Sequence, residues 1–480
     1  MSSENLAADY GLTQVGALRP RSAKDIASSR IGIGMECLDR YMFKPEKTYA
    51  PLEALGAKWA RLQTGWSRCE RQEGIYDFAW LDEVVDRVIA AGVQPWFNVG
   101  YGNRLYSPDA PHESAVGQVP IYDGEKAVKG WQNFLRALGE RYRDRVAYWE
   151  IWNEPNLDCF WHPRHKPSAE EYTKLVAISS EAIRTTHPKA KIAACVASAS
   201  CAFIEGCLKA GMGPHIDVFA FHPYRPDLVP ELEYPAIVER MRDIVRQLAP
   251  HVRLWQGECG APSQTTGHHD TWMKLWNMNE LNQAKWVIRR LMMDLYLDLD
   301  LAQYFHLCDL METPYRQSNG QERPPVMLGI LHGKVYTPKT AYTAMQSVCT
   351  LLDAETRPFP YYQSEIVPSG EAGATLQEPY TLLFRRRNAP VFAYYQATNP
   401  QDDVAPVPVS VTLACDNWPR KPDEFLRHPV LVDPITQRVY ALPDGERLTE
   451  KGQFRSRVRF ARLPCLDYPL LITERELVMD

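Results

Sequence analysis

Two glutamates lie four positions apart in the short apolar run VAYWEIWNEPN, residues 146–156. Apolar and aromatic residues of this kind favour a β-strand, in which residues four apart point to the same face. At about 3.3 Å per residue, Glu150 would lie roughly 13 Å deeper along the strand than Glu154. We therefore expect Glu150 to be a paired carboxylate inside the fold, and Glu154 to stand at the strand end where chemistry is possible.

A second glutamate at the end of a predicted strand is Glu258, in the segment LWQGECGAP. Two carboxylates that face each other across a pocket are what retaining glycoside hydrolysis requires. One protonates the leaving oxygen while the other attacks the anomeric carbon, with about 5–5.5 Å between them. From the residues alone, the alternative that either glutamate is a surface or ion-paired residue stays open, because acids are common in loops.

Eight short runs rich in β-branched and aromatic residues alternate with segments of helical period, which is typical of βα units on a parallel sheet. Eight such units in order predict a (β/α)8 TIM barrel over residues 31–352. In this fold the catalytic residues lie at the carboxyl ends of the strands, where Glu154 and Glu258 are expected. The predicted strands are residues 31–37, 58–66, 94–102, 146–155, 191–198, 216–224, 252–260 and 301–309.

The pattern changes after Leu352. Strand-like pieces, separated by clusters of Pro, Asp and Asn, replace the alternation of strands and helices. They predict an antiparallel β-sandwich domain over residues 353–480, and residues 1–30 are expected to form an N-terminal extension. The pieces read YTLLFRRR, VFAYYQAT, VPVSVTLAC and YPLLITE.

Charge and composition point to no nucleic acid or membrane partner. The net charge is −5, with both signs mixed along the chain and no basic block. No apolar run is long enough for a secretion signal or a membrane span, so we expect a cytoplasmic protein. The 11 cysteines are odd in number and lack CxxC pairs, which favours reduced, buried thiols over a disulfide set.

No cofactor is predicted. His162 and His165, like His268 and His269, lack the ligand spacing of a helical HExxH motif, so we predict no metal site. The chain also contains no GxGxxG or P-loop motif, which disfavours a nucleotide-dependent enzyme.

The stretch WEIWNEPNLDCFW, followed by SAEEYTKL, resembles the strand-four signature of the retaining glycoside hydrolases of clan A, and within it family 39. That family holds β-xylosidases and α-L-iduronidases. Similarity in GAKWARLQTGW, IDVFAFHPY and YFHLCDLMETPYRQ extends the resemblance over most of residues 31–350. It implies a retaining, exo-acting β-glycosidase of β-xylosidase-like specificity, with Glu154 as acid/base and a small glycoside or oligosaccharide as substrate.

The nucleophile segment departs from the family pattern. Family members commonly read Thr-Glu-Phe or Thr-Glu-Trp at this place, whereas this chain reads Gln256-Gly257-Glu258-Cys259-Gly260. Position at the end of strand seven still nominates Glu258 as the nucleophile. On strand eight, where clan members often have a Trp under the sugar, the matching position holds Phe305, with His306 beside it.

Further substrate-binding residues follow from the charge that each step requires and from the resemblance. Arg61 is the candidate cation that keeps the nucleophile ionised; an ion pair with Glu150 is the equally open alternative, and the two can hold together. Asn153 is expected to bond the sugar 2-hydroxyl. His222 and Tyr224, which end strand six, are expected to contact the sugar or the nucleophile, with a structural role as the alternative.

Aromatic and basic residues of the strand-end loops complete the predicted site. Trp66 and Trp161 belong to a set of tryptophans that could stack on sugar faces, although about half of the set should only pack; the others are Trp96, Trp152, Trp272 and Trp276. Arg225 belongs to a basic rim that could bind a uronate or sulfated sugar, with solvated loop charge as the alternative; the others are Arg104, Arg164, Lys166 and Arg316.

Two other functions stay open. One is the same fold acting on a uronic-acid, galactoside or arabinoside linkage. The other is a non-catalytic barrel that binds sugar or protein, which should have lost Asn153, Glu154 or Glu258; all three are present. The family resemblance also makes a homo-oligomer a possible assembly.

Overall fold

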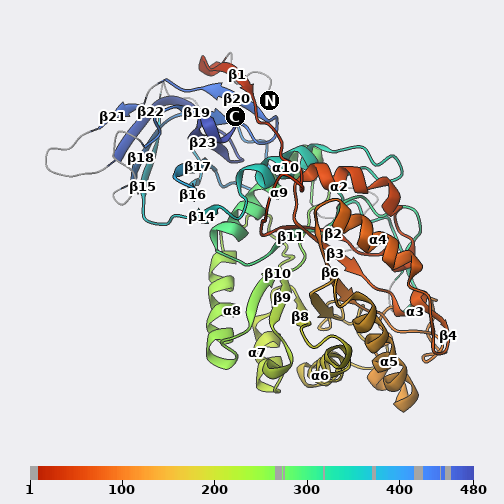
Figure 1. Cartoon of the computed structure of the whole chain (residues 1–480). Coiled ribbons are helices and arrows are strands. Elements are labelled where there is room, and N and C mark those ends of the chain that lie inside the picture. The colour runs from red at the N-terminus through yellow and green to blue at the C-terminus, as the bar shows by residue number, and fades with distance from the viewer. Residues whose placement is uncertain are drawn as a thin grey trace.

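The computed structural model has two lobes, a helix-covered barrel and a group of antiparallel sheets (Figure 1). It describes residues 9–264, 273, 276–316, 319–369, 375–415, 425–443, 445–448 and 456–479. His268, His269 and Trp272 lie outside the described residues.

Eight parallel strands close into a barrel in the order β10-β11-β2-β3-β6-β7-β8-β9. This confirms the predicted TIM barrel, since the strands follow one another around the barrel in chain order. They are short and almost entirely buried, as expected when helices cover the outer face. The strands are β2 (Ile31–Met35), β3 (Trp59–Gln63), β6 (Gln94–Val99), β7 (Tyr148–Ile151), β8 (Lys191–Ala197), β9 (Val218–His222), β10 (Arg253–Gln256) and β11 (Ala302–Tyr304).

Helices surround the barrel (Figure 1). Three begin where an N-cap side chain accepts a backbone N–H bond three residues on: Ser168 from Glu171, Ser200 from Phe203 and Asn279 from Asn282. The helices are α2 (Tyr49–Leu55), α3 (Trp66–Cys69), α4 (Ala79–Ala90), α5 (Gly124–Tyr142), α6 (Ala169–Thr186), α7 (Cys201–Lys209), α8 (Tyr234–Leu248), α9 (Glu280–Tyr296) and α10 (Thr340–Leu351). Within the described residues, none of them is both long and apolar enough to cross a bilayer.

Strand β7 is shorter than the sequence predicted. It ends at Ile151, and the backbone then turns through left-handed conformations at Trp152 (φ 68°) and Glu154 (φ 44°). Glu150 therefore lies on the strand while Glu154 lies on the turn beyond it. The turn, rather than the rise of a continuous strand, separates the two carboxylates.

The remaining strands form two main antiparallel sheets, which confirms the predicted β-sandwich. The larger has the order β1-β20-β19-β23-β17-β16-β14 and the smaller β15-β18-β22-β21. Their strands are β1 (Thr13–Ala17), β14 (Thr356–Pro358), β15 (Gln363–Pro368), β16 (Pro379–Arg386), β17 (Ala389–Gln396), β18 (Val407–Cys415), β19 (Pro429–Val432), β20 (Arg438–Ala441), β21 (Glu446–Arg447), β22 (Ser456–Cys465) and β23 (Leu470–Glu474). Two small ribbons, β4 (Glu70–Gln72) with β5 (Ile75–Tyr76) and β12 (Tyr315–Arg316) with β13 (Glu322–Arg323), lie in loops.

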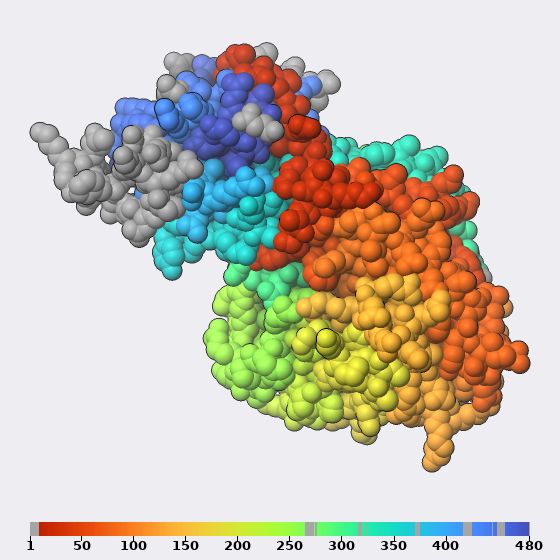
Figure 2. Space-filling model, viewed as in Figure 1, coloured from red at the N-terminus to blue at the C-terminus, as the bar shows by residue number. Residues whose placement is uncertain are grey.

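An N-terminal strand belongs to the larger sheet. β1 pairs with β20, from Thr13 opposite Ala441 to Ala17 opposite Arg438. The red N-terminal segment accordingly lies against the blue C-terminal part of the surface (Figure 2). The sequence predicts residues 1–30 only as an N-terminal extension, whereas Thr13–Ala17 form a strand of the larger sheet. The domain boundaries themselves stay a prediction.

Helix α9 joins the barrel to the sandwich through buried charge. Arg289 donates two hydrogen bonds to Glu231, at 2.9 and 2.6 Å, and a third to the carbonyl of Thr398 at 2.6 Å. Tyr395 of β17 donates to the same glutamate at 2.7 Å. Because Glu231 belongs to the loop after β9, one carboxylate connects a strand-end loop of the barrel, helix α9 and the sandwich.

Breaking this pair should strongly destabilise the protein. We expect Arg289→Ala to lower the free energy of unfolding by about 3–5 kcal/mol, because the carboxylate of Glu231 would stay buried without its cation. The exposed pair of Lys209 and Glu205 provides the control, and Lys209→Ala should leave the urea midpoint nearly unchanged. Equal midpoint shifts for the two variants would contradict a structural role for the buried pair.

Candidate active site

The guanidinium of one arginine binds several side chains at the barrel mouth. Arg61, on β3 and only 1% exposed, donates to Glu150 at 2.8 and 2.5 Å, to Glu36 at 2.8 Å and to Glu258 at 2.5 Å. It also donates to the side-chain oxygen of Asn153 at 2.9 Å. The two alternatives for Arg61, a partner of the nucleophile candidate or of Glu150, hold together in this geometry.

The carboxylates around Arg61 differ in pKa, because burial raises each pKa and the neighbouring cations lower it to different extents. Burial raises the pKa of Glu36 to about 7, against the attraction of Arg61. Burial also raises the pKa of Glu258, although His222 and Arg61 act in the opposite direction. For Glu150, burial alone would raise the pKa, but Arg61 and His222 hold it below the ordinary value. Glu150 is therefore always ionised, whereas the raised pKa of Glu258 allows that carboxylate to take up a proton.

His222, the last residue of β9, lies among three carboxylates. Its Nδ1 is 3.0 Å from Glu154 and 3.7 Å from Glu258, and its Nε2 is 3.8 Å from Glu150. Burial opposes protonation of the ring, yet Glu258, Glu150 and Glu154 together raise its pKa to about 10. The ring therefore carries a positive charge at neutral pH and attracts both candidate catalytic carboxylates.

The two candidate catalytic carboxylates lie close to each other. One oxygen of Glu154, one oxygen of Glu258 and a nitrogen of His222 are all within 4.8 Å of one another. Tyr224, two residues after the end of β9, donates its hydroxyl to the other oxygen of Glu258 at 3.2 Å. Both carboxylates are nearly buried, at 7% and 8% exposed, so each faces a small volume at the carboxyl ends of the strands.

The turn that carries Glu154 is fixed by side chains from neighbouring strands. Asn98 of β6 donates to Glu150 at 2.8 Å and to the carbonyl of Trp152 at 2.7 Å. The backbone N–H of Glu154 donates to the Cys195 sulfur at 3.1 Å. Asn156 both donates to and accepts from the backbone of Ala197, at 3.2 and 2.8 Å. Residues of the Asn-Glu-Pro-Asn motif thus anchor the turn to β3 and β8 while Glu154 projects into the mouth.

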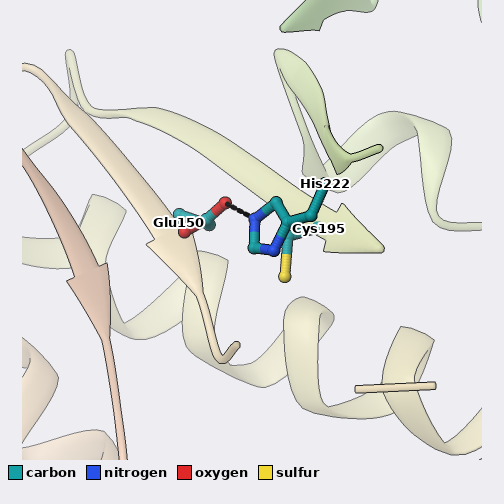
Figure 3. Close-up of side chains that lie close together, drawn as sticks. All are labelled: Glu150, Cys195 and His222. Atoms are coloured by element: carbon teal, nitrogen blue, oxygen red, sulfur yellow. Dashed lines mark ion pairs between the residues drawn. The ribbon is translucent and has the colours of Figure 1, made fainter. Parts of the chain in front are cut away.

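Figure 3 shows Cys195 of β8 beside His222, with the ion pair between that ring and Glu150. The thiol is 3.6 Å from the carbonyl of Trp152, while its sulfur accepts the backbone N–H of Glu154. Burial raises its pKa well above the ordinary value, so the thiol stays protonated and can make both contacts. Its position favours a structural role in the turn.

Two groups of side chains are close enough to hold a metal ion: Glu150 with Cys195 and His222, and Glu154 with His222 and Glu258. His222 belongs to both, and its contacts there are with carboxylates that its own positive charge already neutralises. Metal binding in either group would require this ring to lose a proton that the neighbouring carboxylates hold. In the first group it would also require the Cys195 thiol to ionise, which burial opposes. The donor set therefore fits an ion-pair network better than a metal site.

The predicted residues Phe305 and His306 follow the end of β11, and the centroids of their rings are 5.0 Å apart. Phe305 is 9% exposed, and its N–H donates to the carbonyl of Cys259 at 2.9 Å, which places it beside the Glu258 segment. His306 is buried, with one nitrogen 3.2 Å from the carbonyl of Glu36 and the other 2.9 Å from that of Cys308. Burial lowers its pKa to about 4, so the ring is neutral and occupied by backbone contacts.

The unusual glycines of the nucleophile segment have a steric reason. A Cβ atom at Gly260 would lie 2.0 Å from the carbonyl oxygen of Phe305, and one at Gly257 would lie 3.0 Å from the Cβ of Ala220. At Gly260 the backbone of Phe305 leaves no room for a larger residue, whereas at Gly257 a larger residue would require Ala220 to shift slightly. The departure from the family pattern is thus matched to the local packing.

Among the described residues, no contact brings Trp66 or Trp161 to Glu154 or Glu258. Trp66 is fully buried, donates to Glu70 at 2.5 Å and stacks on Tyr106. Trp161 is also buried and donates to Tyr122 at 3.3 Å. Their predicted contact with substrate stays a prediction that these packing contacts do not support.

The basic rim is mostly neutralised by acids. Arg225 pairs with Asp227 at 2.8 Å and also with Glu233. Arg164 pairs with Asp109 at 3.3 Å, and Lys166 with Asp158 at 2.6 Å. The side chain of Arg316 lies outside what the structure describes. Arg104 differs from the paired residues, since no acid partners it within the described residues.

Glu36, Asn98 and Cys195 reach the site although no motif singled them out. Each contacts a residue of the strand-four segment or Arg61 from a different part of the chain. The one available signal was positional, because Glu36 lies near the carboxyl end of a predicted strand.

Comparison with known proteins finds a family model that matches part of the barrel. Residues 59–238 match the model of glycosyl hydrolases family 39. Over this range the chain is similar to glycosyl hydrolases of family 39. The matched range contains Arg61, Glu154 and His222 and ends before Glu258, so the choice of Glu258 rests on geometry.

Two curated relatives are β-xylosidases. One, from Geobacillus stearothermophilus, is 26% identical over 207 residues, which cover 37% of this chain and 40% of that protein. The other, from Caldicellulosiruptor saccharolyticus, is 24% identical over 335 residues, 61% of this chain and 62% of that protein. The aligned part therefore spans less than two thirds of the length of either relative.

Solved structures show the same fold. A family 39 glycoside hydrolase from Bacteroides cellulosilyticus WH2 superposes with a TM-score of 0.62 at 17% identity, covering 93% of this chain and 81% of that one. A family 30 subfamily 8 xylanase from Clostridium acetobutylicum gives a TM-score of 0.53 at 11% identity, covering 96% and 98%. The family resemblance and the fold predicted from the sequence are both confirmed.

The charge of His222 should appear in the pH dependence of stability. Its pKa is raised to about 10 in the folded protein, against about 6.5 in an unfolded chain. Its protonation therefore stabilises the fold fully below about pH 6.5, and this contribution is lost as pH rises through about 10. We expect His222→Gln to lower the thermal midpoint more at pH 6 than at pH 10.

The control for this measurement is His165→Gln, since the ring of His165 is stacked on Tyr122 at the protein surface. Its midpoint shift should be the same at both pH values. A midpoint shift for His222→Gln that does not change with pH would contradict an imidazolium among the three carboxylates.

Proposed function

We propose that this chain is a retaining, exo-acting β-glycosidase of β-xylosidase-like specificity, with Glu258 as nucleophile and Glu154 as acid/base. The observation that carries the proposal is the approach of these carboxylates, whose oxygens lie within 4.8 Å of each other. Inverting enzymes need about 6.5–9.5 Å between carboxyl groups to admit a water, whereas retaining enzymes need about 5–5.5 Å. The relation to family 39 supports the same reading.

In the first step, Glu258 attacks the anomeric carbon and the glycosidic bond breaks as Glu154 gives its proton to the leaving oxygen. Arg61, His222 and Tyr224 stabilise the ionised form of Glu258 against the burial that opposes it. As Glu154 becomes an anion, the His222 imidazolium at 3.0 Å stabilises it. The step leaves a glycosyl ester on Glu258.

In the second step, Glu154 takes a proton from water, the hydroxide attacks the anomeric carbon and the ester to Glu258 breaks. The sugar is released with its original anomeric configuration. The side-chain oxygen of Asn153 accepts a hydrogen bond from Arg61, so the NH2 group of Asn153 remains available for the sugar 2-hydroxyl. That bond strengthens in the oxocarbenium-like transition state.

The proposed substrate is a xyloside. The two curated relatives named β-xylosidase support a xyloside. A panel of nitrophenyl glycosides tests it: β-xyloside should be the best substrate, and preference for a uronic-acid, galactoside or arabinoside linkage would replace the xyloside assignment. A cytoplasmic location and a homo-oligomer stay predictions.

Azide should separate the two carboxylate roles. In Glu258→Ala, azide can occupy the vacated space and displace an activated leaving group once, so the glycosyl azide should have inverted configuration. In Glu154→Ala, azide should attack the ester on Glu258, and two displacements give a retained glycosyl azide. Each variant should lose about 10²-fold or more in kcat without azide. Product NMR identifies the anomer.

Glu150→Ala is the matched control, since Glu150 is a buried carboxylate bound to the same Arg61 as Glu258. It should gain no glycosyl azide product. Rescue of Glu150→Ala, or an inverted sugar from the unmodified protein, would show that the roles are wrongly assigned.

The nucleophile should also set the acid limb of the pH profile. Because the pKa of Glu258 is raised, kcat/KM should begin to fall at a pH above the ordinary carboxyl value as Glu258 takes up a proton. Tyr224→Phe removes a hydroxyl that stabilises the anion, so its acid limb should move up by at most about one pH unit. An acid limb unchanged in Tyr224→Phe would contradict the hydrogen bond as a determinant of Glu258 ionisation.

A further inference from the structure

A cavity opens on the face of the barrel that holds Glu154 and Glu258. It has a volume of about 790 Å³ and is formed by the loops after β2, β3, β6 and β11. That size lies within the range of small-molecule sites, about 300–1,000 Å³. Its lining includes Tyr41, Arg68, Arg71, Arg104, Leu105 and Thr313.

Hydrogen bonds connect this cavity to the carboxylates. Arg40, in its wall, donates to Gln63 at 2.6 Å, and that amide donates to Asn98 at 2.8 Å. Asn98 in turn donates to Glu150 at 2.8 Å. The cavity thus adjoins the polar network of the candidate active site.

The cavity carries positive charge that the protein does not neutralise. Across the described residues, no carboxylate lies within ion-pair distance of Arg68, Arg71 or Arg104, whereas Arg164 and Arg225 of the same mouth both have acidic partners. Arg68 is held between the rings of Tyr41 and Trp80, 4.0 and 3.9 Å from their centroids. Its guanidinium is thereby fixed in orientation without a counter-charge.

The acids in the wall are largely committed to other partners. Asp39 pairs with Arg40 at 3.2 Å. Glu70 is fully buried, and its oxygens accept from Trp66, Tyr106 and the backbone of Gly74. Glu113 is exposed, so Glu70 and Glu113 together contribute two negative charges against the three cations that have no acid within ion-pair distance. The cavity therefore has a net positive charge and suits an anion.

Two exposed apolar side chains lie among these cations. Tyr41 is 47% and Leu105 39% exposed, and both line the cavity. The Tyr41 hydroxyl accepts a hydrogen bond from Arg71 at 2.9 Å, so the ring and that guanidinium are held together. An aromatic face beside arginines is what recognises a sugar ring that carries an acidic group.

We propose that this cavity binds a sugar unit bearing a carboxylate or sulfate group, located in the leaving group of the substrate. The inference rests on the proposed function, because an exo-acting enzyme places everything beyond the cleaved sugar in the leaving group. Arg71 and Arg104 bind the acidic group and Tyr41 contacts the ring. The protein then prefers acidic oligosaccharides over neutral ones of equal length.

The test uses disaccharides with the preferred first sugar and one of three leaving units: glucose, glucuronic acid or glucose 6-sulfate. We expect kcat/KM to be about tenfold higher for one or both acidic units, with the uronate and sulfate arms identifying the group. The double variant Arg71→Gln/Arg104→Gln should lose about 10- to 100-fold on the preferred acidic substrate, through KM. Its activity on the nitrophenyl monosaccharide should be unchanged.

Arg164→Gln is the control, because Arg164 lies on the same mouth but is paired with Asp109. It should keep the preference for acidic substrates. Equal kcat/KM for neutral and acidic disaccharides, or a double variant that keeps the preference, would overturn the proposal.

Binding to Glu154→Gln separates this inference from the proposed function. Calorimetry with the uronate disaccharide should show binding that Arg71→Gln/Arg104→Gln weakens. Such binding without hydrolysis by the unmodified protein would overturn the catalytic proposal alone. Hydrolysis of glycosides without preferential binding of the acidic disaccharide would overturn the cavity proposal alone.

Discussion

The structure of the site depends on the buried guanidinium of Arg61. Three carboxylates, Glu36, Glu150 and Glu258, share its positive charge at 2.5–2.8 Å. Charges removed from water are tolerated only when they are paired and hydrogen-bonded, and a planar guanidinium can donate five bonds in fixed directions. A lysine would supply the charge but could not hold the carboxylates in one plane. Arg61 therefore sets both the charge and the geometry of the barrel mouth.

His222 supplies the second positive charge that this concentration of carboxylates requires. Arg61 acts on Glu150 and Glu258 from β3, whereas His222 reaches Glu150, Glu154 and Glu258 from β9. The two cations thus keep Glu150 ionised in the interior, while Glu154 and Glu258 lie at the mouth, where protons can be exchanged. Sequence spacing alone could not show this division, because the contacts join residues of β3, β7 and β9 with residues of the segments that follow β7 and β10.

The eight strands and the position of Glu154 beyond the end of one of them could be predicted from local patterns. Strand and helix periods are local, and the Asn-Glu-Pro-Asn motif is itself a turn with paired side chains. By contrast, Cys195 and Asn98 contact the turn from separate strands and have no local signature. Position at a strand end also does not tell which way a side chain faces, so Trp66 was grouped with the site although it packs on Tyr106.

The pairing of β1 with β20 has a consequence for how the chain acquires its structure. Thr13–Ala17 align with residues 438–441, so one edge of the larger sheet is closed by the beginning and the end of the sequence together. During synthesis at about 5–20 residues per second, the first strand waits tens of seconds for its partner. The barrel has the same property, because β2 must await β11. Both sheets are therefore completed late, and the emerging chain carries unpaired strand edges that need protection from aggregation until then.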